Sequence, residues 1–340
     1  MNIFGLDIGS HSIKICQLAK QQDKKWRLVS AGLVPSPQPG MQSEQEADFI
    51  KVAEQVKKLY QEAKITTKDV VLSLPESQIF SRVIEMPLMS ENELAQAVPW
   101  EAEQFIPMPL SEVTLDWQIV KPAAVGKEME KMKIFIVAAP TVLIKKYIDI
   151  AEMAGLNVAA IESESLALAR ALQTASSPFS ILVNFGAKST DLTIAAGQKI
   201  LLTRSISTAG EALTRAIATN LVLEPGQAEE YKKAYGLEEK EAEGKIRKAL
   251  LPVLDVLANE IQKTILAWKE KENQPLSGLI LAGGSAGLAQ IGLYLASKLG
   301  LEVQTADPFS SLTVDPNFIA KLKPNASLFS VAVGLAQKEI

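Results

Sequence analysis

A short motif that occurs twice, about half a chain apart, constrains the fold more than any other feature of the sequence. LDIGSHSIKI at residues 6–15 aligns with VNFGAKSTDL at residues 183–192 in a chain of 340 residues. Each copy predicts a strand, a glycine-containing turn and a second strand. Two related halves that each begin with such a hairpin predict one ligand held between two similar domains. The aligned positions are Asp7 with Asn184, Gly9 with Gly186, Ser12 with Ser189, and Lys14 with Asp191.

The chemistry of the two hairpins suits a phosphate group. Glycine lacks a Cβ atom, so backbone N–H groups in such turns can approach a phosphate closely. Asp7 could order a magnesium ion through water, and Lys14 is suited to phosphate oxygens. An ordinary hairpin turn also explains one such motif. Its repetition, together with the loop Gly283-Gly284-Ser285 after a late strand, favours a nucleotide site. The hydroxyl side chains that could add donors are Ser10, Ser12, Ser189 and Thr190.

Composition narrows the function classes. The chain has 35 basic and 39 acidic side chains, a net charge of −4, which disfavours a dedicated nucleic-acid binder. It has one histidine, His11, and one cysteine, Cys16, which excludes an internal disulfide and zinc sites built from several such residues. Neither a Walker A sequence nor a Rossmann G-x-G-x-x-G is present. Nucleotide binding would therefore use the paired hairpins.

Hydrophobic periodicity predicts an α/β chain with an almost wholly helical stretch at 209–272 and a small α+β insert at 82–160. Ser90 and Glu93 predict a capping box at the start of a helix, and Pro99 is expected to break or kink that helix. The uncharged stretch 273–297 is expected to be a buried strand, a tight loop and a helix, because glycines interrupt it. Strands are predicted at 2–8, 13–19, 26–34, 70–74, 80–88, 113–120, 133–138, 158–161, 179–184, 190–195, 199–205, 277–282 and 301–305. Further helices are predicted at 44–63, 141–154, 163–174, 286–299 and 326–338.

Five segments, in order along the chain, resemble the motifs of the actin-like ATPase superfamily. GLDIGSHSIKI and VNFGAKSTDLTI resemble its two phosphate motifs, and LILAGGSAGLAQIGLYLASKLG resembles its adenosine motif. IESESLALARAL and SLFSVAVGLAQK resemble its two connecting helices. The resemblance implies an actin-like α/β fold of two related domains with a nucleotide cleft, and it implies ATP and Mg²⁺ as cofactors.

A narrower resemblance is to the PilM family of type IV pilus assembly proteins, in the FtsA-like branch of that superfamily. It is carried by the opening IFGLDIGSHSIKICQL, by the insert, and by GEALTRAIA and AEEYKKAYG. The resemblance implies four subdomains. These are 1A at 1–81, 161–178 and 306–340, the insert 1C at 82–160, 2A at 179–208 and 274–305, and the helical 2B at 209–273.

The resemblance also implies the residues of an ATP site. Asp7 would hold magnesium through water, with Asn184 also on the metal side, and Glu162 would orient the attacking water as the catalytic residue. The first phosphate loop would be Gly9, Ser10, Ser12 and Lys14, and the second Gly186, Ala187, Ser189 and Thr190. The ribose and adenine side would be Gly210, Glu211, Glu229 and Lys232, with Gly283, Gly284 and Ser285 against the adenosine.

Asn184 departs from the family motif, which usually has aspartate at this position. Asparagine keeps an oxygen ligand but loses one negative charge near the metal. We therefore expect nucleotide binding with slow or absent hydrolysis.

The function implied is that of a cytoplasmic adaptor without nucleic-acid partners. It would bind the N-terminal cytoplasmic tail of the inner-membrane protein PilN and other pilus assembly proteins, reaching the membrane only through them. The peptide is expected in a groove between the insert and the first domain. Two alternatives stay open: an FtsA-like filament protein of cell division, and a small-molecule kinase of the sugar-kinase type. Such a kinase needs a catalytic aspartate, and Asp116 is the only aspartate within 80–120.

Overall fold

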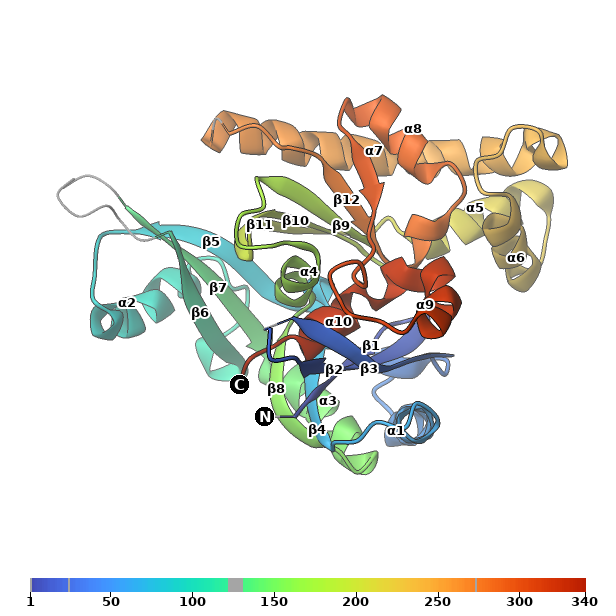
Figure 1. Ribbon diagram of the computed structural model, residues 1–340. Helices are drawn as coiled ribbons and strands as arrows, with labels where there is room; N and C mark the ends of the chain where they lie inside the picture. The colour runs from blue at the N-terminus through green and yellow to red at the C-terminus, as the bar shows by residue number, and fades with distance from the viewer. Residues whose placement is uncertain (1, 24, 122–130, 273) are drawn as a thin grey trace.

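The computed structural model describes residues 2–23, 25–121, 131–272 and 274–340. Its described residues form three sheets, two of five strands and one of three (Figure 1). The two large sheets contain the two copies of the repeated motif, and the small sheet is the insert. The expected α/β architecture of two related halves is confirmed.

The first sheet has the strand order β3-β2-β1-β4-β8. Strand β1 pairs antiparallel with β2 and parallel with β4. Helices α1 (Glu46–Glu62) and α3 (Thr141–Met153) pack on one face, where Val56 and Ile150 are fully buried. Helix α10 (Ser330–Ala336) covers the other face. The strands are β1 (Phe4–Ile8), β2 (Ser12–Lys20), β3 (Trp26–Pro35), β4 (Asp69–Leu74) and β8 (Asn157–Ser163).

The second sheet repeats this arrangement in the order β11-β10-β9-β12-β13. In the first hairpin the Gly9 N–H donates to the Ser12 carbonyl at 3.1 Å, and in the second Gly186 donates to Ser189 at 3.0 Å. The repeat seen in the sequence is therefore a repeat of backbone geometry. The strands are β9 (Ser180–Phe185), β10 (Thr190–Ala196), β11 (Lys199–Ile206), β12 (Leu279–Ala282) and β13 (Val303–Thr305).

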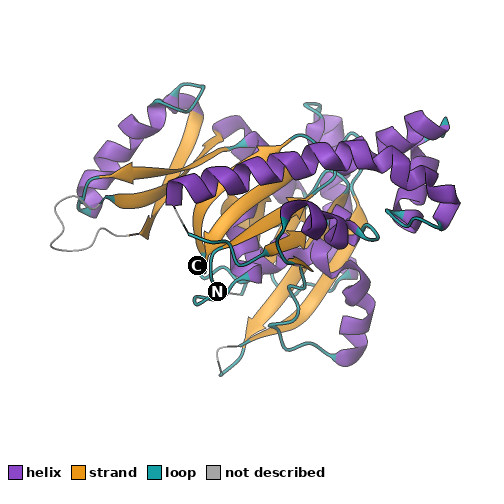
Figure 2. Ribbon diagram, turned by 90° about the horizontal axis from the view of Figure 1, so that it is seen from above, coloured by secondary structure: helices purple, strands orange, loops and turns teal. Residues whose placement is uncertain are grey.

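Helices occupy the segment after β11, as predicted, and the longest of them runs along one side of the second half (Figure 2). Its apolar face, which includes Leu250, Leu257 and Ile261, packs in the core formed with the second sheet. The described residues contain no helix that is both long and apolar enough to span a membrane. These helices are α5 (Gly210–Leu221), α6 (Pro225–Tyr235), η4 (Glu241–Gly244) and α7 (Lys245–Glu272), and η5 (Gly284–Gly287) and α8 (Ile291–Leu299) follow β12.

The insert is a sheet of order β5-β7-β6 with one helix packed on it. The capping box of Ser90 and Glu93 is present at the start of α2 (Glu91–Glu103). Pro99 does not break the helix, because buried Leu94, Val98 and Ala102 anchor both sides of it to the sheet. The remaining elements are β5 (Phe80–Met86), η3 (Leu110–Glu112), β6 (Val113–Lys121) and β7 (Met132–Pro140).

The separate sheet is shorter than the expected insert 82–160. Helix α3 and strand β8 pack in the core of the first half, so the insert sheet runs from Phe80 to Pro140. The insert also contacts the second half. Val120 and Phe135 share a buried cluster with Ile200 of β11, and β5 lies beside β11 (Figure 1). The insert is thus bound to both halves.

Helices α4 (Glu164–Leu172) and α10 connect the halves and cross very closely. A Cβ atom added at Gly334 of α10 would lie 1.8 Å from the carbonyl oxygen of Ala167 in α4. The expected helix 326–338 is divided into η6 (Lys323–Phe329) and α10, preceded by α9 (Pro316–Leu322). Because α4 also contacts the second half through Leu168 and Ala169, this crossing joins both sheets.

Candidate functional site

A cavity of about 670 Å³ lies between the two halves. It is lined by both hairpins, by the loop after β12, and by residues of α5 and α6. Most of the sequence-predicted site residues line it together, although they come from distant parts of the chain. They are Asp7, Gly9, Ser10, Ser12, Lys14, Asn184, Gly186, Ala187, Ser189, Gly210, Glu211, Glu229, Lys232, Gly283, Gly284 and Ser285.

The first hairpin carries a buried ion pair at the cavity wall. Asp7 and Lys14 are cross-strand neighbours, and Lys14 Nζ lies 2.9 Å from Asp7 Oδ2. The ammonium group also donates to the Ser12 carbonyl at 3.2 Å. Both side chains are almost fully buried, so the pair is held in one geometry beside the turn. The site therefore presents a fixed anion and a fixed cation next to each other.

The second hairpin carries the equivalent pair with different chemistry. Asn184 faces Asp191 across the strands, in the register that Asp7 and Lys14 have in the first hairpin. Asp191 accepts hydrogen bonds from Ser189, at 2.9 Å, and from Ser205. The carboxylate that is missing at position 184 is thus present on the neighbouring strand, where it also lines the cavity.

Glu164 stands at the cavity wall between the two hairpins. Its Oε2 accepts a hydrogen bond from Asn184 Nδ2 at 3.1 Å. Burial, with the negative charges of Asp7 and Asp191, holds the pKa of Glu164 well above its usual range. Burial also raises the pKa of Asp191, against the hydrogen bonds from Ser205 and Ser189. A cation bound here would favour the ionised carboxylates.

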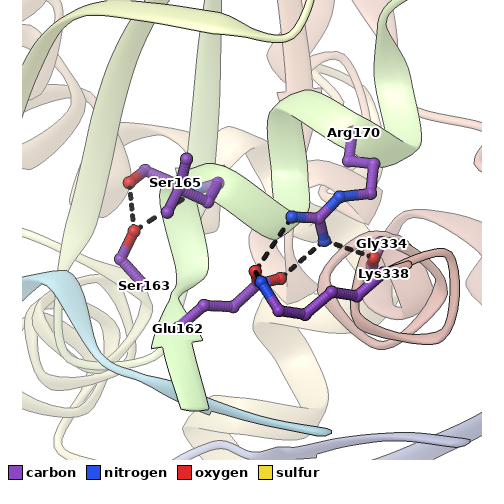
Figure 3. A network of polar contacts seen from close by, with 7 residues as sticks. Glu162, Ser163, Ser165, Arg170, Gly334 and Lys338 are labelled. Atoms are coloured by element: carbon purple, nitrogen blue, oxygen red, sulfur yellow. Dashed lines mark hydrogen bonds and ion pairs between the residues drawn. The ribbon is translucent and has the colours of Figure 1, made fainter. Parts of the chain in front are cut away.

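Glu162, which the resemblance proposed as the catalytic residue, does not line the cavity. Its carboxylate is held by Arg170 Nη1 at 2.6 Å and Nη2 at 2.9 Å, and by Lys338 Nζ at 2.9 Å (Figure 3). Arg170 also donates to the Gly334 carbonyl at 2.7 Å. The expectation that Glu162 lies in the nucleotide site is therefore wrong, because its side chain does not reach the cavity. This side chain binds α4 to α10, and Glu164, two residues later, occupies the cavity wall.

Thr190 also differs from expectation. Its side chain is fully buried, and its hydroxyl donates to the Thr208 carbonyl at 2.8 Å instead of pointing into the cavity. Thr190 begins strand β10, where side chains alternate between faces, so its neighbours Ser189 and Asp191 face the cavity. Thr190 therefore packs beneath the turn of the second hairpin and is not part of the cavity wall.

The other end of the cavity is formed by α5 and α6. Lys232 Nζ is buried and donates to the Gly210 carbonyl at 3.1 Å and to Thr214 at 2.8 Å, and it pairs with Glu229 at 2.6 Å. Although burial opposes it, hydrogen bonds from Lys232 and Thr214 lower the pKa of Glu229 to about 2. Burial lowers the pKa of Lys232. This pair is rigid and is not the surface ion pair that its helical spacing alone would suggest.

Glycines allow the loops of this cavity to approach one another. Gly283 has φ +86°, and a Cβ atom there would lie 2.6 Å from the Phe185 carbonyl oxygen. At Gly210 it would lie 2.8 Å from Ser285 Oγ. The first contact brings the loop after β12 against the second hairpin, and the second brings it against the start of α5, as a nucleotide cradle between the halves requires.

For magnesium, the described side chains form no cluster of three or more histidine, cysteine or acidic residues that could hold an ion directly. Asp7, Glu164 and Asp191 nevertheless face the same cavity. This donor set fits an ion that keeps its water molecules and is held mainly by phosphate oxygens.

Sequence reasoning missed several residues of the cavity wall, among them Glu164, Asp191 and Tyr147. A signal existed for Asp191, which aligns with Lys14 in the repeat. Glu164 shares the segment IESES with Glu162, and periodicity could not choose between them. For Tyr147 of α3 we find no sequence signal, because its helix was expected to belong to the insert.

Comparisons with known proteins agree with this geometry. The family model described as type IV pilus assembly protein PilM matches residues 5–340. A solved PilM–PilN type IV pilus biogenesis complex contains a chain with 28% identity and a TM-score of 0.86, covering 99% of this chain and 98% of that one. The ethanolamine utilization protein EutJ from Carboxydothermus hydrogenoformans has 16% identity and a TM-score of 0.60, with 98% and 88% covered. MreB5 of Spiroplasma citri, bound to ADP, has 16% identity and a TM-score of 0.53, with 98% and 94% covered. The last two matches support the fold alone.

Proposed function

The chain belongs to the PilM family of type IV pilus assembly proteins, and we propose that it is a nucleotide-binding adaptor that binds the N-terminal tail of PilN. The observation that carries the proposal is the match to the family model over residues 5–340. The adaptor would meet the inner membrane through PilN. The kinase alternative loses support, because Asp116 lies on β6 of the insert, bound to the backbone N–H of Trp117, and does not line the cavity.

The nucleotide is proposed to be ATP, bound in the cavity between the halves. The backbone and hydroxyl groups of the two turns would hold the phosphates, and Lys14 would neutralise part of their charge. Lys232, Gly210 and the loop 283–285 would hold the adenosine end. A cavity of about 670 Å³ is within the usual range of small-molecule sites.

Magnesium is proposed to accompany the nucleotide and would neutralise phosphate charge when bound. Asp7 would orient its water shell, and Asp191 would supply the second charge in place of Asn184. Glu164 replaces Glu162 as the candidate that orients an attacking water, because it lies at the cavity wall and accepts from Asn184. Slow hydrolysis stays our prediction, because Asn184 does not carry the negative charge that the family motif usually places beside the metal.

ATP with magnesium is expected to raise the melting temperature of the protein by several degrees. A ligand at about 100 times its dissociation constant stabilises the folded state by about 2.7 kcal/mol. Each kcal/mol corresponds to ~2–4 °C for a chain of this size. Asp7→Asn should reduce the shift, whereas Asp23→Asn, on an exposed side chain outside the cavity, should leave it intact. Thermal unfolding with millimolar ATP and magnesium measures this, and no shift in the wild type would contradict it.

The PilN tail is proposed to bind in a second cavity, of about 280 Å³, at the base of the insert, which unlike the groove expected from the sequence is also lined by the second half. Phe80, Ser81 and Arg82 of β5 line it, with Phe105 of the insert and Thr203 of β11. Arg82 stacks on Phe105, with 5.3 Å from Cζ to the ring centroid. These groups offer both an apolar wall and polar partners for the main chain of an extended peptide.

Phe105→Ala is expected to weaken binding of a synthetic PilN tail peptide by at least about fivefold, because it removes an aromatic wall of the cavity. The wild-type dissociation constant should be on the order of micromolar, since ordering a flexible tail costs entropy. Trp100→Ala is the matched control, because Trp100 is an aromatic residue of the same insert that is 75% exposed and does not line this cavity. Calorimetric titration of the whole protein distinguishes the two. Equal affinities in both variants would place the peptide elsewhere.

A further inference from the structure

The cavity between the halves is lined in part by both chain segments that connect the insert to the first half. Ser77 and Gln78 of η2 (Glu76–Gln78) line it just before β5. Tyr147 lines it from α3, which begins at the residue directly after β7. Figure 1 places α3 on the opposite side of β1 from α6, which carries the adenosine-side pair Glu229 and Lys232. Tyr147 thus lines the cavity from the first half, whereas Glu229 and Lys232 line it from α6 of the second half.

The Tyr147 hydroxyl is a polar group of this part of the wall that the proposed nucleotide site has not used. The residue is 2% exposed, yet its hydroxyl has no hydrogen-bond partner among the residues that the structure describes. Among the described residues, three side-chain atoms are fully enclosed and lack a partner, and the Tyr147 hydroxyl is not one of them. They are Glu76 Oε2, Gln173 Oε1 and Gln337 Oε1. The hydroxyl of a cavity-lining tyrosine that is neither paired nor enclosed faces the cavity itself. The hydroxyl is therefore available to donate to a ligand in the cavity.

The surroundings of Tyr147 keep its hydroxyl a donor. Burial raises the pKa of Tyr147 far above its ordinary value, and the negative charges of Glu164 and Asp7 raise it further. The same two charges place it near the groups proposed to act around the metal and the attacking water. A neutral donor there suits an oxygen of a phosphate group, which accepts strong hydrogen bonds.

We propose that Tyr147 binds the terminal phosphate of ATP and that the insert thereby responds to whether the nucleotide is a triphosphate or a diphosphate. The proposal rests on the nucleotide site proposed above and adds a residue and a role to it. Adenosine at the α6 end directs the last phosphate towards α3. ADP lacks the group that would reach the hydroxyl.

The attachment of α3 explains how this contact would reach the insert. Lys146, next to Tyr147, donates to the carbonyls of Met41 at 2.8 Å and Ser43 at 2.6 Å, and Met41 also lines the cavity. These hydrogen bonds tie helix α3 to the cavity wall on one side. At its other side it continues from β7, the central strand of the insert sheet. A shift of α3 on phosphate binding would move β7, and with it the base of the second cavity.

The test compares AMPPNP with ADP, each with magnesium, in the full chain. Tyr147→Phe keeps the buried ring and removes only the hydroxyl. It should weaken AMPPNP binding about tenfold, the usual effect of losing one hydrogen bond to a charged group, and change ADP binding less than about twofold. Tyr60→Phe is the matched control, because Tyr60 packs against the same core from α1 but does not line the cavity. Its affinities for both nucleotides should equal those of the wild type.

Amide hydrogen exchange of the wild type supplies the second readout. AMPPNP should protect η2 and β7 more than ADP does, and Tyr147→Phe should abolish the difference. The inference fails if the variant loses affinity for both nucleotides equally, if it loses none, or if exchange in the wild-type insert is the same with both. If the wild type binds neither nucleotide, the proposed nucleotide site itself fails, which distinguishes the two ideas.

Discussion

Gly334→Ala is expected to destabilise the protein by more than about 3 kcal/mol, at the upper end of what one added methyl group does in a packed core. The added Cβ would lie 1.8 Å from the Ala167 carbonyl oxygen and 2.9 Å from the Ala167 Cα atom. Both are main-chain atoms of α4, so no side-chain rotation can relieve the overlap. The helices must separate, which weakens the cluster of Ala167, Val331 and Leu335 as well.

Chemical denaturation of the purified protein measures this effect as a fall in the midpoint. Gly226→Ala is the control, because Gly226 is also helical, in α6, and a Cβ atom there has no neighbour within 4 Å. Alanine favours helix over glycine, so the control should be neutral or stabilising by up to about 1 kcal/mol. Equal midpoints for the wild type and Gly334→Ala would show that the crossing of α4 and α10 is looser than described.

Glu162→Ala is expected to cost about 3–5 kcal/mol of stability, the range for breaking a buried ion pair from one side. The side chain of Glu162 is 3% exposed, and its removal leaves the Arg170 guanidinium without its two carboxylate bonds and Lys338 without its partner. Lys338 is partly exposed and can turn to solvent, whereas Arg170 is largely buried. The cost should therefore arise mainly at Arg170.

The matched control is Glu339→Ala, which removes the carboxylate of an exposed pair with Lys20 and should cost less than about 1 kcal/mol. Nucleotide affinity of Glu162→Ala, measured below its melting temperature, should stay near the wild-type value because Glu162 does not line the cavity. The opposite pattern, normal stability with lost nucleotide binding or turnover, would restore Glu162 to the site and contradict its structural role.

The choice between Glu162 and Glu164 shows where sequence reasoning reached its limit. Both acidic residues lie at the junction of β8 and α4, and only two positions separate them. Which one faces the nucleotide depends on what packs against the other. Glu162 is bound by Arg170 of α4 and by Lys338 near the C-terminus. Lys338 is so far from Glu162 in the sequence that no local pattern could reveal this contact.

Distant contacts also explain why the insert is shorter than expected and why helix α2 continues across Pro99. Helix α3 has an apolar face that would suit either the insert or the first sheet, and contact with α1 decides for the first sheet. Pro99 weakens a helix locally, but the buried side chains on both sides of it keep α2 continuous. In both cases tertiary packing outweighs a local tendency.

The sequence by itself determined the two hairpins, the order of the elements and the glycine loops that line the cavity. Its alternation of apolar residues and its repeated D/N-x-G-x-x-S turn are local properties, and Gly9 and Gly186 impose the same geometry in both copies. Only the tertiary structure decided which charges meet across the cavity. It brought Glu164 to Asn184, placed Tyr147 in the cavity wall, and set Asp191 opposite Asn184 on the neighbouring strand. Such pairings depend on how two separately folded halves and an insert are held together, and that depends on contacts far apart in the chain.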